Sequence, residues 1–137
     1  MKSFVNFGSR LPQTIYLTET DTVTRSLSTF SIISGMSVTP PHGTYLVIFT
    51  ATQRLATANA DGEFAIFKNT TQITESTRRV FLNITTVAGL IGNAHGANGT
   101  PIAKVTVNGK ESISARFRAT NGTIACDNRS MILLEVN

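Results

Sequence analysis

The side chains that could carry out chemistry are few and lie far apart in the chain. There is one cysteine, Cys126, and there are two histidines, His42 and His95. A catalytic thiol needs an activating base beside it, and nothing in the spacing points either histidine at Cys126. A zinc ion needs three or four ligands at short spacing, which these residues do not supply. We therefore expect Cys126 to be a small buried side chain, and we expect neither a metal ion nor a cofactor.

The carboxylates do not suggest a hydrolase. Glycoside hydrolysis needs two carboxyl groups that face each other across the bond to be cleaved. Asp61, Glu63 and Glu75 are close in sequence, but Asp61 stands in an Asp-Gly turn pattern and Glu63 opens a predicted strand. The sequence therefore predicts a protein that is not an enzyme.

A glycine-rich stretch at Gly89–Gly99 contains His95 and Asn98. It lacks the Gly-Lys-Ser/Thr sequence of a phosphate-binding loop. The pattern predicts a long loop, and functional contacts are often carried by loops. We expect either a plain connector or a binding loop that uses His95 and Asn98.

The composition is that of one folded domain. The chain has 137 residues, of which 41% are hydrophobic and 15% charged, so it is too apolar to be disordered. The net charge is +4, without a run of five like charges, and the basic residues are not interleaved with aromatic ones in the stacking pattern of proteins that bind single-stranded nucleic acid. We therefore expect no nucleic-acid partner.

Membrane and export signals are also missing from the sequence. No stretch approaches the ~20 apolar residues that span a bilayer. Met1–Gly8 lacks the apolar core of a signal peptide. We expect synthesis in the cytosol and no membrane partner.

Alternation of apolar and polar residues with a period of two dominates the sequence and predicts β-strands. The strongest strand is predicted at Thr44–Thr52, and both of its faces are apolar, as they are in Met131–Val136. Strands of this kind lie in the centre of a sheet or press against another subunit.

Turn signals separate the predicted strands. Asp61-Gly62 is a tight-turn pattern. Asn108-Gly109 predicts a hairpin between Ile102–Val107 and Ser112–Arg118, and Asn121-Gly122 predicts a second such turn. About eight to ten short strands with turns every 8–12 residues are typical of an all-β sandwich or jelly roll with two packed antiparallel sheets.

The chain shows no linker and no internal repeat. Residues 26–137 are predicted to form one jelly-roll domain. Residues 1–25 are less clearly patterned, so we expect an arm or an irregular edge there, which is a candidate for docking on another protein.

Four segments follow one another in a recognisable order. They are Gly43–Phe49, Phe64–Asn69, Val105–Ala115 and Ser130–Val136. Together they resemble the jelly-roll domains of the tumour necrosis factor / complement globular-head superfamily, especially the short versions found among phage virion proteins. That family has a Lys/Arg-Asn-Gly turn, in which Thr70 here replaces the glycine. It also has a Gly-Asp-x-Ile/Val element, whose aspartate is displaced here within Gly109–Ile113.

The resemblance implies a ten-stranded jelly roll that packs as a homotrimer around a threefold axis. The trimer contact would be the inner sheet, which contains the strand after Gly43 and the last strand. From this we expect five residues to lie in the core or at the trimer interface. They are Tyr45, Val47, Phe49, Phe117 and Leu133.

The resemblance also implies a structural virion protein, made in a bacterial cytoplasm. It would be a phage capsid decoration (cement) protein or a head-fibre trimer that binds the major capsid protein or another virion protein. The alternative is a receptor-binding fibre tip that recognises a host-surface glycan. The lack of tryptophan favours decoration, because glycan sites usually present exposed aromatic rings.

Overall fold

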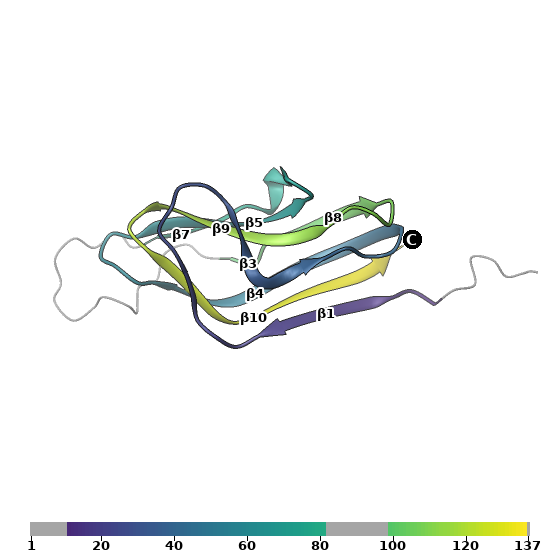
Figure 1. Cartoon of the computed structure of the whole chain (residues 1–137), viewed down its shortest axis with the longest axis horizontal. Coiled ribbons are helices and arrows are strands. Elements are labelled where there is room, and N and C mark those ends of the chain that lie inside the picture. Colours follow the sequence, from purple (N-terminus) through teal and green to yellow (C-terminus); the bar gives the residue numbers. More distant parts are fainter. Residues whose placement is uncertain (1–10, 82–98, 137) are drawn as a thin grey trace, which may run out of the picture.

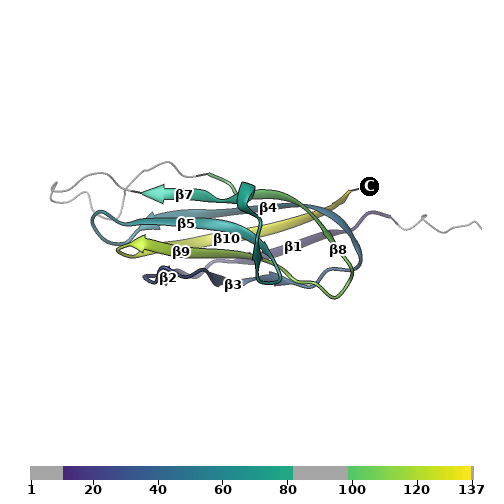
Figure 2. The same ribbon diagram turned by 90° about the horizontal axis from the view of Figure 1, so that it is seen from above.

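The computed structural model describes residues 11–81 and 99–136, and it is an all-β sandwich of two antiparallel sheets (Figure 1). The strands run along the long axis of the molecule, as the second view also shows (Figure 2). The predicted fold class is therefore confirmed. The described residues contain ten strands and one short 3-10 helix, η1 (Thr74–Ser76).

Each sheet contains five strands. The first sheet has the order β1-β10-β4-β8, with β2 also paired to β10. Its strands are β1 (Thr14–Glu19), β2 (Val23–Arg25), β4 (Gly43–Leu55), β8 (Ile102–Val107) and β10 (Ile124–Val136). The second sheet has the order β3-β9-β5-β6, with β7 also paired to β5. Its strands are β3 (Ser31–Val38), β5 (Asp61–Lys68), β6 (Thr71–Gln72), β7 (Arg78–Phe81) and β9 (Ile113–Asn121).

The pairing pattern is that of a jelly roll. The outermost strands in the sequence pair with each other, β1 with β10 and β3 with β9. The pairs β4 with β8 and β5 with β7 follow toward the middle of the sequence. This nested order belongs to jelly rolls in general, so it supports the fold and does not single out one family.

The predicted Asn108-Gly109 hairpin is wrong. β8 pairs with β4, whereas β9 pairs with β3 and β5 in the other sheet. Asn121-Gly122 likewise lies between β9 and β10, which belong to different sheets. Both glycines have positive φ, 92° at Gly109 and 63° at Gly122, but Asn108 and Asn121 do not, so neither turn has positive φ at both residues as a two-residue hairpin of this type requires. The turns carry the chain across the sandwich instead of back along one sheet.

The predicted Asp61-Gly62 turn is also wrong, because both residues lie in β5. The turn is earlier, where Asn59 has a φ of 57°. Gly62 is needed for a close approach between strands, since a Cβ atom there would lie 2.4 Å from the carbonyl oxygen of Arg118.

The core fills the space between the two sheets. At its centre are three aromatic rings, Phe49 from β4, Phe64 from β5 and Phe117 from β9. Phe64 lies 6.1 Å from Phe49 and 5.8 Å from Phe117 between ring centroids. The core therefore joins the sheets by direct aromatic contact. β4 lies between β10 and β8, which is the central place its sequence indicated.

Residues 1–25 contain two strands of the sandwich. β1 and β2 both pair with β10, and Ile15 and Leu17 of β1 pack against the core. The structure therefore includes residues 14–25 in the sandwich as edge strands, so the predicted start at residue 26 is displaced. β1 gives only these two side chains to the core, so its pattern in the sequence is weak.

A bulge in β10 directs one charged side chain inward. The pairing of β10 with β4 shifts between Asp127 and Ser130, and Asn128 has a φ of 45°. Arg129 follows and its side chain is fully buried. It donates hydrogen bonds to the carbonyl oxygens of Ser34 (2.9 Å) and Asp21 (2.6 Å), and it pairs with the Asp21 carboxylate (2.8 Å). Arg129 thereby ties β10 to β3 and to the β1–β2 connection.

Candidate functional site

The outer face of the first sheet carries a row of apolar side chains. Strand pairing places Tyr16, Ile132, Ile48 and Ile102 next to one another on β1, β10, β4 and β8. Tyr16 is 62% exposed and Ile102 is 42% exposed, and the two residues between them are half-buried. With their apolar neighbours these residues form what we call the apolar face. It consists of Tyr16, Leu46, Ile48, Ile102, Ile132, Leu134 and Val136, and the exposed Lys104 lies beside Leu46 at its edge.

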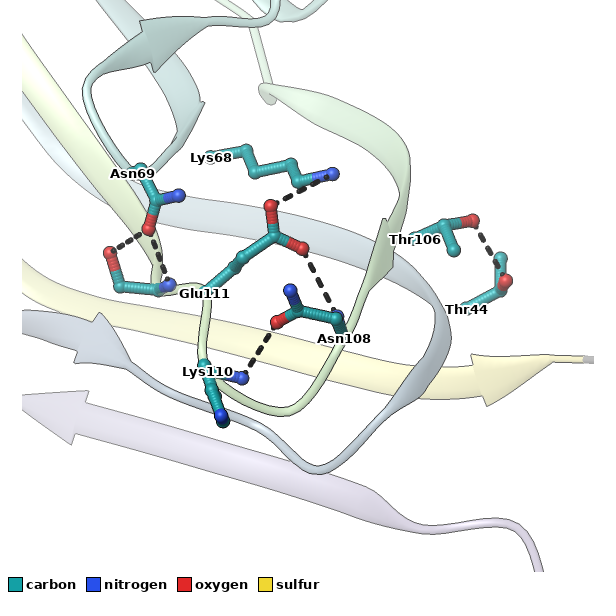
Figure 3. Close-up of polar contacts among 8 residues, drawn as sticks. Thr44, Lys68, Asn69, Thr106, Asn108, Lys110 and Glu111 are labelled. Carbon is teal, nitrogen blue, oxygen red and sulfur yellow. Dashed lines mark hydrogen bonds and ion pairs between the residues drawn. The ribbon is translucent and has the colours of Figure 1, made fainter.

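Two hydroxyl pairs lie near the two ends of the apolar face. The Oγ1 atoms of Thr44 and Thr106 are 2.9 Å apart (Figure 3). Thr50 Oγ1 and Ser130 Oγ are 2.8 Å apart. Because these hydroxyls bond to each other, removing water from the face leaves fewer polar groups without a partner. The apolar face is therefore suited to contact with another apolar surface.

The outer face of the second sheet has the opposite character. Arg79 Nε donates to Asp61 Oδ1 at 2.9 Å, and Arg118 Nε donates to Glu63 Oε1 at 2.8 Å. The hydrogen bond from Arg79 is the main cause that lowers the pKa of the Asp61 carboxyl. We call this surface the charged face. It consists of Asp61, Glu63, Arg79, Arg116 and Arg118. The two outer faces of the sandwich therefore differ in chemical character.

The five residues predicted for the core or the trimer interface all lie in the core. Tyr45, Val47, Phe49 and Leu133 are fully buried and Phe117 almost so. They cannot also contact a second copy, because their side chains point between the two sheets of one copy. The outward side chains of β4 and β10 are the alternate residues, which the sequence showed to be apolar as well.

Two motifs behind the family resemblance meet at one end of the sandwich (Figure 3). Asn69 Oδ1 accepts a hydrogen bond from the backbone N–H of Ser112 at 3.0 Å, and Asn69 N–H donates to the Ser112 carbonyl at 2.8 Å. Lys68 Nζ lies 3.4 Å from Glu111 Oε2, and Glu111 Oε1 accepts from Asn108 N–H at 3.0 Å. Asn69 has a φ of 52°, so it occupies the left-handed position of the turn. These contacts join the β5–β6 turn to the β8–β9 connection and serve the fold.

Cys126 is buried in the core. Burial, the largest influence, raises the pKa of its thiol to about 12. At neutral pH the sulfur therefore keeps its proton, and a thiol reagent at pH 8 should modify the folded protein roughly a thousandfold more slowly than the unfolded chain. The rate of modification, measured with and without denaturant, checks this expectation. Comparable rates in the two conditions would contradict the burial of Cys126.

The same raised pKa has a consequence for stability. Between pH 9 and about 12 the unfolded thiol loses its proton while the folded one keeps it, so the free energy of unfolding should fall as the pH rises through this range. The Cys126→Ala variant should lose less stability over the same range, as thermal melts at pH 8 and pH 10.5 would show.

The remaining predictions concern a binding loop, a metal ion and a membrane span. His95 and Asn98 lie outside the described residues. Within residues 11–81 and 99–136, no three His, Cys, Asp or Glu side chains are grouped so that they could hold a metal ion. In the same part of the chain, no helix has the length and apolarity of a membrane span. Of the surfaces described above, the apolar face has the composition that suits contact with an apolar partner.

Comparisons with known proteins give little guidance. The sequence matches no protein-family model and no curated protein. Among solved structures, a chain from the structure of infectious bursal disease virus, Gx strain, is similar, with a TM-score of 0.43 and 10% identity. The similarity covers 90% of this chain and 32% of the viral chain, so this chain spans about a third of the length of its viral counterpart. A similarity of this size does not bear on function.

Proposed function

We propose that the protein is a structural virion component that assembles as a homotrimer through the apolar face. Its place would be a phage capsid, as a decoration (cement) protein or a head fibre made in the bacterial cytoplasm. It would bind the major capsid protein or another virion protein. The role is one of assembly and has no catalytic step.

The observation that carries the proposal is the row of Tyr16, Ile132, Ile48 and Ile102 across four strands. A second copy fits this face because the face is apolar and its flanking hydroxyls are already paired. The resemblance adds its support, since it implies that the sheet containing β4 and β10 makes the trimer contact. Contacts that bury such a row exclude water from several residues at once.

Native mass measured by light scattering tests the proposal. The wild-type protein should have three times the 14.7 kDa mass of the chain. The Ile132→Lys variant would place a charge at the centre of the contact between copies, from which water is excluded. An unpaired charge there destabilises the contact by about 3–5 kcal/mol. We expect this variant to be monomeric at concentrations at which the wild type is trimeric.

A matched pair of variants separates the two faces. Ile102 on the apolar face and Ile32 on the second sheet are 42% and 44% exposed. Ile102→Lys should weaken the trimer, whereas Ile32→Lys should leave the mass unchanged. A monomeric wild type would rule out the trimer, and a trimer that survives both Ile132→Lys and Ile102→Lys would place its contact elsewhere.

A further inference from the structure

Two arginines of β9 lie over aromatic rings on the second sheet. The Arg116 guanidinium carbon is 4.6 Å from the centroid of Phe67, and that of Arg118 is 4.6 Å from the centroid of Phe30. The two rings meet edge to face with centroids 5.1 Å apart. The sequence predicted no interleaving of basic and aromatic residues. The fold creates one from three separate segments, which a reading of adjacent residues cannot detect.

The two arginines differ in how their charge is balanced. Arg118 pairs with Glu63. Arg116 Nε donates to Ser114 Oγ at 3.1 Å, and its Nη2 donates to the Asn69 carbonyl at 2.8 Å. Both of these acceptors are neutral, and among the described ion pairs none involves Arg116. A guanidinium has five N–H donors, so three are left after these two contacts.

The position of Arg116 is fixed before any partner arrives. The Phe67 ring below it and the two hydrogen bonds restrict the side chain, so little rotamer entropy is left to lose on binding. Ile32 of β3 lies opposite Arg116 in the strand pairing and is 44% exposed. An uncompensated guanidinium therefore stands next to an exposed aliphatic side chain, and arginine and apolar residues of this kind are typical of protein contact surfaces.

We propose that Arg116 and Ile32 form a docking site for a segment of another protein that presents a carboxylate beside an apolar side chain. The carboxylate accepts two hydrogen bonds from the free guanidinium donors, and the apolar side chain covers Ile32. The inference rests on the proposed function in one respect. It gives a protein that assembles through the apolar face a second surface for a different virion protein.

The charge of the surroundings favours a protein segment over a polyanion. The charged face holds three arginines and two carboxylates, Asp61 and Glu63, which leaves one positive charge. Nucleic acids and sulfated glycans bind through several neighbouring cations, and here they would meet the two carboxylates. A single carboxylate at Arg116 avoids this repulsion.

Binding of a labelled Gly-Leu-Glu-Leu-Gly peptide with an amidated C-terminus, which presents one carboxylate between apolar side chains, tests the site by fluorescence anisotropy. The control peptide has glutamine in place of glutamate. We expect the wild-type protein to bind the glutamate peptide about tenfold more tightly than the glutamine peptide. Arg116→Lys should lose most of this difference, because lysine cannot form two parallel hydrogen bonds to a carboxylate. Arg79→Lys, on the same face but paired with Asp61, should keep it.

Several results would overturn the inference. They are equal binding of the two peptides by the wild type, unchanged binding by a folded Arg116→Lys variant, and tighter Arg116-dependent binding of heparin. Thermal melts establish that the variants are folded. The native mass of each sample separates this site from the trimer, since a monomer that binds the peptide through Arg116 contradicts only the proposed trimer. A trimer that does not discriminate between the peptides contradicts only the docking site.

Discussion

Replacing Arg129 by alanine is expected to lower the free energy of unfolding by about 3–5 kcal/mol. The side chain is fully buried and donates to the carbonyl oxygens of Ser34 and Asp21. Without it, these two carbonyls lose a partner inside the protein, and a large cavity opens beside the β10 bulge. Urea unfolding followed by circular dichroism measures the loss.

Two controls show whether the guanidinium is the cause. Arg129→Lys keeps the charge but cannot reach three acceptors at once, so most of the destabilisation should remain. Asp21→Ala should cost less, about 1–2 kcal/mol, because the Asp21 side chain is 65% exposed and water screens its attraction to Arg129. An Arg129→Ala variant within about 0.5 kcal/mol of the wild type would mean that Arg129 does not hold β10, β3 and the β1–β2 connection together.

The strands themselves were the most predictable part of the fold. The segments Thr44–Thr52 and Met131–Val136 stand out because both of their faces carry apolar residues. The strands that contain them, β4 and β10, prove to be inner strands of the first sheet. Alternation depends only on neighbouring residues, so a strand can be recognised without knowing which strands it pairs with. The pattern is weaker in β1 and β2, because they give little to the core and are held mainly by their pairing with β10.

The connections between strands could not be read with the same success. The residues at Asn108-Gly109 and Asn121-Gly122 specify positive φ, and the structure has it at both glycines. A positive φ fixes how sharply the chain turns, but the sheet that receives the next strand depends on pairings across the whole chain. β9 pairs with β3 and β5, and no local signal contains that information.

The candidate site was half visible in the sequence. The two apolar faces of β4 pointed to contacts on both sides, but alternation cannot say which set points inward. Tyr45 proves to face the core and Ile48 the outside. Arg129 gave no signal at all, because its partners Asp21 and Ser34 lie 108 and 95 residues away.

Phe49→Ala is expected to lower the free energy of unfolding by about 3–5 kcal/mol, because it removes a fully buried ring from the centre of the core. The ring stacks on Phe64, so its loss removes an aromatic contact between the two sheets. Phe49→Leu should recover a large part of this loss, since it leaves a smaller cavity. Denaturant midpoints of the three proteins give the measurement.

The neighbouring residue makes this prediction sharper. Ile48 is next to Phe49 in β4 but belongs to the apolar face, so Ile48→Ala should leave the fold of one copy nearly intact and weaken only the contact between copies. Its effect on the midpoint should therefore fade as the protein is diluted, whereas that of Phe49→Ala should persist at every concentration. If both effects were equally independent of concentration, Ile48 would not lie between copies. If both faded on dilution, the core assignment of Phe49 would be wrong.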